Sequence, residues 1–148
     1  MLKFEVAGNA FKVLADAARR SRGMIWKAVI AGGYDVVRQA KINVKQVLNT
    51  TGKAQGNLGR SIVMIPQEAN LLVRVGPEAI YGAVHEFGAT IHPVKGEFLW
   101  FEGKDGGLVH VRKVTIPARP YLGPALKACY QKIRARIDAA AKRLFPGV

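Results

Sequence analysis

The chain has 148 residues, of which 49% are hydrophobic and 22% charged, so a single folded domain over residues 1–148 is expected rather than a disordered or fibrous chain. Lys and Arg outnumber Asp and Glu by 23 to 10, and the net charge of +13 favours polyanionic partners such as nucleic acid or an acidic protein surface. No apolar run approaches the roughly 20 residues that span a bilayer, and the first residues lack the pattern of an export signal. We therefore expect no membrane partner.

The first third of the chain predicts two helices. Residues 10–18 have the pattern of a short helix, which Gly23 is expected to interrupt. A longer helix is predicted over residues 24–48, because apolar side chains recur there every three or four positions. Gly32 and Gly33 weaken it, since each glycine costs about 1 kcal/mol relative to alanine in a helix. Either a kink or close packing against a neighbour would explain the pair.

The middle of the chain predicts short strands joined by turns. A loop rich in turn-forming residues comes first, and Pro66 is expected to stop the strand that follows it. In chain order the predicted elements are a loop at 50–57, strands at 61–65 and 71–75, a helix at 78–87, and strands at 90–94, 97–101 and 108–116, with a glycine-rich hairpin tip at 103–107.

A last helix is predicted over residues 122–144, with the lone cysteine, Cys129, on its apolar stripe. A thiol in that position is typical of an inert core residue. Strands joined by hairpins form antiparallel sheets. The predicted fold class is therefore α+β: an antiparallel sheet of about four or five strands, packed by the long helix of the N-terminal half and the C-terminal helix, with a protruding β-hairpin.

The residues that usually carry catalysis or bind metals form no recognisable pattern. His85, His92 and His110 lack the spacing of a zinc site. Ser61 and Cys129 have no neighbouring base in the sequence, and the glycines around Lys53 do not have the order of a phosphate-binding loop. We therefore predict that the chain is not an enzyme and uses no cofactor or metal.

Two segments carry a family resemblance. Residues 80–89 read Ile-Tyr-Gly-Ala-Val-His-Glu-Phe-Gly-Ala, and residues 115–126 read Thr-Ile-Pro-Ala-Arg-Pro-Tyr-Leu-Gly-Pro-Ala-Leu. Together they resemble the tail-completion and virion-morphogenesis proteins of long-tailed bacteriophages, the minor tail or head–tail joining group. A third piece, residues 51–62, resembles the family's Thr-Gly-x-Leu-x-x-Ser-Ile segment, but with an insertion of about four residues after the glycine.

The resemblance implies a structural virion protein that forms a ring at the tail-to-head joint, as a tail terminator or tail-completion protein, and allows DNA to pass. Its implied partners are further copies of itself, with a hexamer expected, the tail tube protein, and the head–tail connector or stopper protein. The implied location is the neck of the virion, after assembly in the bacterial cytoplasm. The alternative suggested by the charge is a basic nucleic-acid-binding module.

The two segments also supply candidate assembly residues. Two prolines stiffen the turn that presents Arg119, and Glu86 is the candidate carboxylate partner of this arginine, within the subunit or across an interface. The other reading is that the second segment simply starts the last helix. For Tyr81 and Phe87, core packing is expected ahead of partner contact. The full set is Tyr81, Glu86, Phe87, Gly88, Pro117, Arg119, Pro120, Tyr121 and Leu122.

Two further sets of side chains are candidates for contact with partners. Phe98, Trp100 and Phe101 lie on the predicted protruding hairpin, and large exposed apolar side chains often mark an interaction site. We expect this hairpin to contact a neighbouring subunit or an adjacent ring. Basic side chains on the two long helices are candidates for non-specific contact with viral DNA, although a solvated face or an acidic connector surface would also explain them. These are Lys41, Lys45, Lys132 and Arg136.

Overall fold

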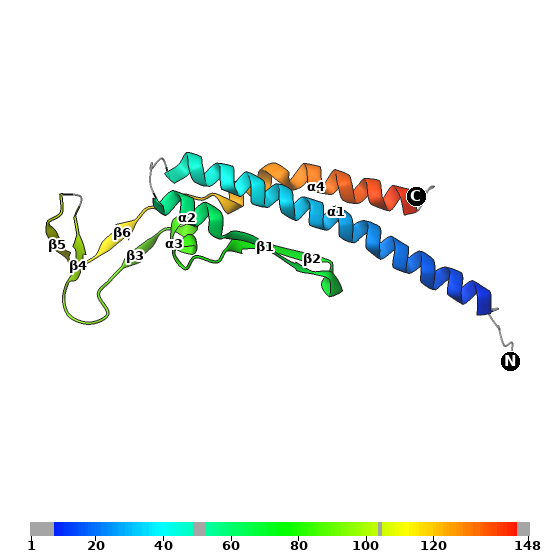
Figure 1. The fold of residues 1–148 in the computed structure, drawn as a ribbon, viewed down its shortest axis with the longest axis horizontal. Helices are drawn as coiled ribbons and strands as arrows, with labels where there is room; N and C mark the ends of the chain where they lie inside the picture. Colours follow the sequence, from blue (N-terminus) through cyan, green and yellow to red (C-terminus); the bar gives the residue numbers. More distant parts are fainter. Residues whose placement is uncertain (1–7, 49–52, 104, 145–148) are drawn as a thin grey trace.

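Two long helices run along an elongated molecule (Figure 1). The structure, a computed structural model, describes residues 8–48, 53–103 and 105–144. Helix α1 (Gly8–Leu48) and helix α4 (Leu122–Leu144) lie side by side and antiparallel, and their contact is the most extensive between any two described elements. The predicted helix at 122–144 is confirmed with the same bounds, and so is the predicted helix end at residue 48.

Helix α1 is a single helix of 41 residues, so the predicted interruption at Gly23 is wrong. At 1.5 Å per residue it is about 60 Å long. A side chain at Gly23 would meet nothing within 4 Å, so no packing requires glycine there. One interior glycine costs about 1 kcal/mol, which is less than the packing of a long amphipathic face contributes.

The strands form three separate two-stranded antiparallel sheets instead of one sheet of four or five strands. The α+β class is confirmed, but the sheets are smaller than predicted. The strands and short helices are β1 (Ile62–Gln67), η1 (Glu68–Asn70), β2 (Leu72–Pro77), α3 (Tyr81–Phe87), β3 (Ala89–Ile91), β4 (Leu99–Glu102), β5 (Leu108–Val111) and β6 (Val114–Ile116). β1 pairs with β2, β3 with β6, and β4 with β5.

Most predicted strand bounds differ from the observed ones by one to three residues, and two of the differences have identifiable reasons. Residues 108–116 form two strands rather than one, because the ladder breaks at Arg112 and Lys113 and each half pairs with a different partner. β1 continues through Pro66 to Gln67. Proline lacks a backbone donor but is tolerated in a strand with an unpaired edge, and β1 has β2 as its single neighbour.

Close packing accounts for the Gly32-Gly33 pair in α1, and the helix continues through it. A Cβ at residue 32 would lie 2.9 Å from Cγ1 of Ile133 on α4. A Cβ at residue 33 would lie 2.5 Å from Sδ of Met64 on β1 and 2.6 Å from Cγ1 of Val73 on β2. The two glycines therefore allow α1 to lie against α4 and the β1–β2 hairpin at once.

Part of the predicted loop at 50–57 is a helix instead, because α2 (Lys53–Ser61) begins at residue 53. The first residues of the predicted loop, 50–52, lie outside the described ranges. Leu58 of α2 is completely buried in the core, and the Ser61 hydroxyl donates a hydrogen bond to the Leu58 carbonyl over 2.8 Å. Burial of one large apolar side chain contributes about 1.5–3 kcal/mol, which offsets the turn preference of the glycines around it.

The core is small and lies where α1, α2, β1 and α4 meet. Its largest fully buried side chains are Tyr121, Leu58, Ile62 and Val44. Cys129 is also buried there, as predicted. Residues 89–116 project from this body as an arm, with β3 and β6 as its stem and β4 and β5 as its outer part (Figure 1). The predicted protruding hairpin is therefore confirmed.

Candidate assembly site

The two segments that carry the resemblance contact each other through Glu86. Its Oε2 accepts hydrogen bonds from the backbone amides of Tyr121, over 2.7 Å, and Leu122, over 2.9 Å, and its Oε1 accepts one from Gly123 over 2.9 Å. These amides lie at the start of α4, where the first donors of a helix lack partners within it and the helix dipole favours negative charge. Glu86 therefore caps α4 from α3.

Tyr121 extends this connection into the core. Its hydroxyl donates a hydrogen bond to the Gly82 carbonyl over 3.3 Å, and its own carbonyl accepts one from Nδ2 of Asn43 on α1 over 3.0 Å. Burial, followed by the nearby charge of Glu86, raises the pKa of Tyr121 to about 12. Tyr121 thus joins α1, α3 and α4 from within the core, where its side chain is fully buried.

Of the two alternatives for Arg119 and Glu86, pairing inside the subunit is not what the structure shows: these two described residues form no ion pair, and the Glu86 carboxylate accepts from three backbone amides. Arg119 instead donates its backbone N–H to the His85 carbonyl over 2.7 Å, and its side chain is exposed between the exposed Pro117 and Pro120. The guanidinium therefore points to solvent from a stiff turn. Its pairing with a carboxylate across an interface stays a prediction.

Gly88 allows the turn after α3 to pass close to the stiff proline turn. Its φ is +73°, a conformation that side chains disfavour. A Cβ at this position would also lie 2.9 Å from the Ala118 backbone nitrogen and 3.0 Å from the Ile116 carbonyl oxygen. Gly88 thus has two independent reasons to be glycine.

The expectation that Tyr81 and Phe87 pack in the core is wrong for the single subunit. Phe87 is 80% exposed and Tyr81 is 41% exposed. Tyr81 packs edge-on against the ring of His85, with ring centroids 6.1 Å apart, and Nδ1 of His85 is buried without a hydrogen-bond partner. The short helix α3 buries Gly82 and Glu86 and leaves its aromatic side chains on the surface.

An apolar groove of about 790 Å³ lies between α1, β2, α3 and α4. Gly32 and Gly33 form part of its wall, and Ile80, which is 95% exposed, and Phe87 lie at the α3 end. The volume lies within the range of pockets that bind ligands or side chains, about 300–1,000 Å³. No simple periodicity marks this groove in the sequence, because four elements contribute to it.

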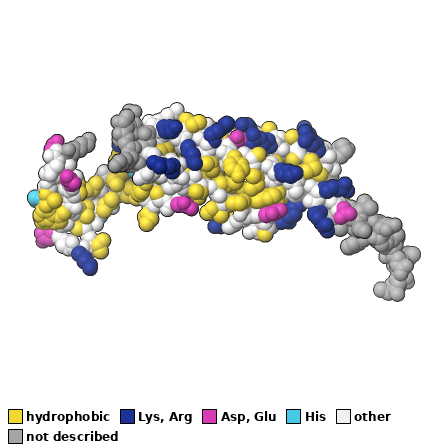
Figure 2. Space-filling model, viewed as in Figure 1, with side chains coloured by type: hydrophobic (Ala, Val, Ile, Leu, Met, Phe, Trp, Pro, Cys, Tyr) yellow, Lys and Arg dark blue, Asp and Glu magenta, His cyan; other side chains and the backbone are white. Residues whose placement is uncertain are grey.

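The arm carries a second apolar surface, which includes the three predicted aromatic residues. Trp100 is 62% and Phe101 is 44% exposed. On one face Phe98 and Trp100 pack against His110, with ring centroids 5.3 and 5.0 Å from it, and the Arg112 guanidinium lies 5.7 Å from the Phe98 ring. Hydrophobic side chains also gather on the body and on the arm in Figure 2.

Basic side chains are spread over the two long helices (Figure 2). Of the predicted DNA-facing residues, Lys132 and Arg136 on α4 both pair with Asp35 on α1. Partial burial acts to raise the pKa of Asp35, but hydrogen bonds from Arg136 and Lys132 outweigh it and hold the pKa below its ordinary value. These two cations therefore connect the helices. Lys41 is half-buried and Lys45 exposed on α1.

Within the described ranges, no three His, Cys, Asp or Glu side chains cluster closely enough to hold a metal ion. None of the described helices combines the length and apolar character needed to cross a membrane.

Comparison with known proteins gives one match. The sequence profile of the phage virion morphogenesis family matches residues 11–140, most of the chain, so the chain belongs to that family. No curated protein and no solved structure matches it. The family is one of structural virion proteins, and both Glu86 and the start of α4 lie within the matched range.

Proposed function

From this membership of the phage virion morphogenesis family, we propose that the protein forms a ring at the tail-to-head joint of a long-tailed phage. As a tail terminator or tail-completion protein, it finishes the tail and connects it to the head while leaving a passage for DNA. Six copies are expected to form the ring. Its other partners are the tail tube protein on one side and the head–tail connector or stopper protein on the other.

The observation that supports this proposal is the amount of apolar surface that a small core leaves uncovered. Ile80 and Phe87 are 95% and 80% exposed beside the groove, and Leu108 is 70% exposed on the arm. Contiguous exposed apolar surface is uncommon on monomers and usually marks a site of association. Two such surfaces on one elongated subunit suit a protein whose working form is an assembly.

The charge of the helices supports contact with DNA in the passage. Residues 8–48 contain eight basic and two acidic side chains, and residues 122–144 contain six and one. A surface with this excess attracts a polyanion without reading its sequence. Lys41 and Lys45 are the candidates on α1, and Lys132 and Arg136 can contribute in addition to their pairing with Asp35.

Electron microscopy of the purified protein tests the proposal directly. Closed rings in class averages are the expected result, and a monomer at all concentrations would overturn it. A second test removes residues 104–107 at the end of the arm, where Gly103 donates its backbone N–H to the Gly107 carbonyl over 2.8 Å. Deletion is expected to impair assembly or tail joining, and unchanged rings and unchanged joining would argue against a role for the arm.

A basic nucleic-acid-binding module is the second candidate, favoured by the net charge of +13. Such a module would bind duplex DNA as a monomer or dimer, with an affinity that falls steeply as salt increases. A ring protein of the neck would bind naked DNA weakly. Titration of a duplex at two salt concentrations, combined with the mass of the bound species, separates the two functions.

A further inference from the structure

We propose that the tip of the arm of one copy, residues 97–110, docks in the apolar groove of a second copy. This inference depends on the proposed function as a ring protein, and it specifies which two surfaces join neighbouring copies in the ring. The arm leaves Trp100, Phe101 and Leu108 exposed, and the groove leaves an uncovered volume of about 790 Å³ beside Leu126, which is 54% exposed.

The chain's own arm cannot fill its own groove. The stem pairs Ala89 with Ile116 and Ile91 with Val114, and this ladder directs the tip away from the body (Figure 1). Folding the tip back would break the stem and displace the turn around Gly88, where Ala118 approaches closely. A second molecule can present its arm without such a change.

The outer part of the arm has too little structure of its own to remain uncovered. It is a single antiparallel pair of four-residue strands, and an isolated two-stranded hairpin is marginally stable at best in water. Both of its faces carry apolar side chains, with Trp100 on one face, and Phe101 and Val109 on the other. A groove that encloses the hairpin would cover both faces.

The distribution of charge favours a head-to-tail contact between copies. The tip contains three acidic side chains and one basic side chain, a charge of −2, whereas the rest of the chain contains 22 basic and seven acidic ones, a charge of +15. The tip acids are Glu97, Glu102 and Asp105.

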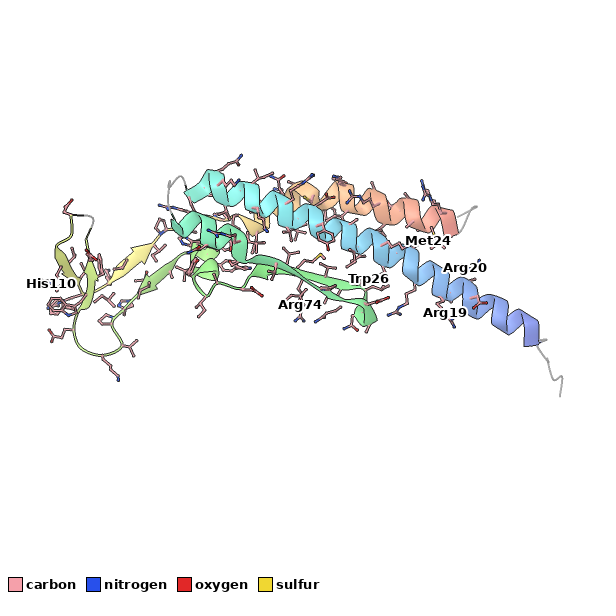
Figure 3. The ribbon with its side chains drawn as sticks, viewed as in Figure 1. Arg19, Arg20, Met24, Trp26, Arg74 and His110 are labelled. Carbon is pink, nitrogen blue, oxygen red and sulfur yellow. The ribbon has the colours of Figure 1, made fainter. Side chains whose placement is uncertain are left out.

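Arginines lie at the opposite end of the molecule from this tip. Figure 3 places His110 at the end of the arm and Arg19 and Arg20 on α1 toward the other end, with Arg74 on β2 between them. The groove extends toward that end, because its wall includes Leu71 in the turn after β1. Arg22 donates hydrogen bonds to the carbonyls of the same turn. An acidic tip that enters at this end meets the arginines beside the groove, whereas the charged side chains of the groove wall itself, Glu78 and Glu86, lie toward α3.

A contact between two different surfaces of identical chains repeats from copy to copy. It closes into a ring when the rotation between copies is suitable, and otherwise continues as a filament. The arm-in-groove contact is of this kind, so it supplies a physical route from the subunit to the ring.

Cysteine cross-linking tests the contact. Leu108→Cys on the arm and Leu72→Cys in the groove, next to the turn that Arg22 contacts, replace exposed side chains, and the native Cys129 is buried. When the two variants are mixed and oxidised, a cross-linked dimer containing one of each is expected. Tyr34→Cys, at a residue of α1 that is 63% exposed and outside the groove, is the matched control and is expected to give none with Leu108→Cys.

Charge exchange gives a second measurement. Glu97→Lys with Glu102→Lys on the arm, or Arg19→Glu with Arg20→Glu on α1, is expected to weaken assembly about tenfold at low salt. Combining all four substitutions is expected to restore it. Rings that form without the cross-link to Leu72→Cys, or whose assembly is unchanged by the charge substitutions, overturn the arm-in-groove contact and leave the proposed ring intact. A protein that stays monomeric overturns both.

Discussion

The carboxylate of Glu86 accepts a hydrogen bond from the backbone amide of Tyr121 over 2.7 Å. This bond joins the two segments that resemble the family, although 35 residues separate them in the chain. Within one subunit, this hydrogen bond holds α3 against the start of α4. The side chains that this connection leaves exposed, such as Phe87 and Arg119, are candidates for contacts in the proposed ring.

Removing the carboxylate of Glu86 should destabilise the fold more than removing its charge alone. Glu86→Ala leaves three amides at the start of α4 without partners, and we expect a loss of about 2–3 kcal/mol in the free energy of unfolding. Glu86→Gln keeps one acceptor oxygen and should lose about 1 kcal/mol. Denaturant titration measures both. Glu78→Ala, at an exposed residue shortly before α3, is the control, and equal stability of all three variants would contradict the capping role.

Tyr121 predicts an alkaline transition. Its folded pKa of about 12 lies above the ordinary value of 10.0, so its contribution to stability is complete below pH 10 and is lost as the pH rises toward 12. Tyr121→Phe removes the hydroxyl that donates to Gly82. We expect it to lose about 1 kcal/mol at neutral pH and to show a shallower loss of stability between pH 10 and 12.

Stability curves of the wild type and Tyr121→Phe across this pH range provide the measurement. Tyr34→Phe is the matched control, because Tyr34 is exposed. If Tyr34→Phe flattened the alkaline loss as much as Tyr121→Phe did, the buried hydroxyl would not be its source.

The sequence predicted the helical part of this fold well because periodicity reports a buried face directly. The stripe from Leu122 to Leu144 gave the bounds of α4, and the apolar positions before Leu48 gave the end of α1. Prediction failed where long-range packing decides the local structure. Burial of Leu58 stabilises helix α2 in a glycine-containing sequence that would otherwise favour a turn. Residues 108–116 form two strands because each half pairs with a different partner strand.

The candidate site shows the same division. The motifs identified Glu86 and Tyr121. Opposite charges in the two motifs suggested Arg119 as the partner of Glu86, whereas the partners in the subunit are backbone amides that no side-chain pattern reveals. The groove was not predicted, since its wall comes from four elements. The Gly32-Gly33 pair was the one feature of the groove that the sequence analysis noted, and the sequence could not distinguish close packing from a kink.

Asp35 should make the contact between α1 and α4 sensitive to acid. Its folded pKa lies below the ordinary value of 3.8, so its contribution is present above that pH and is lost as the pH falls through the lower folded value. Asp35→Asn should cost about 1–2 kcal/mol at neutral pH and reduce the loss of stability below pH 4. Asp138→Asn, which breaks the exposed pair with Arg134, should cost less than about 0.5 kcal/mol. Equal costs for the two variants would contradict a special role for Asp35.

Substitution by alanine should lower the stability of the protein at two glycines of α1 and raise it at a third. Gly33→Ala places a methyl group 2.5 Å from Sδ of Met64, and Gly32→Ala places one 2.9 Å from Cγ1 of Ile133. Each should lose about 1–3 kcal/mol, since the packed neighbours must move. Gly23→Ala adds a methyl group with nothing within 4 Å, so it should gain about 0.5–1 kcal/mol from the lower backbone entropy of the unfolded chain.

Thermal unfolding of the three variants provides the measurement, because all carry the same chemical change within one helix. A gain in stability for Gly33→Ala would mean that α1 does not lie against β1 and β2 as closely as described. A loss for Gly23→Ala would mean that a further contact covers that part of α1. The opposite signs together test the close approach of α1 to its neighbours, on which one wall of the groove depends.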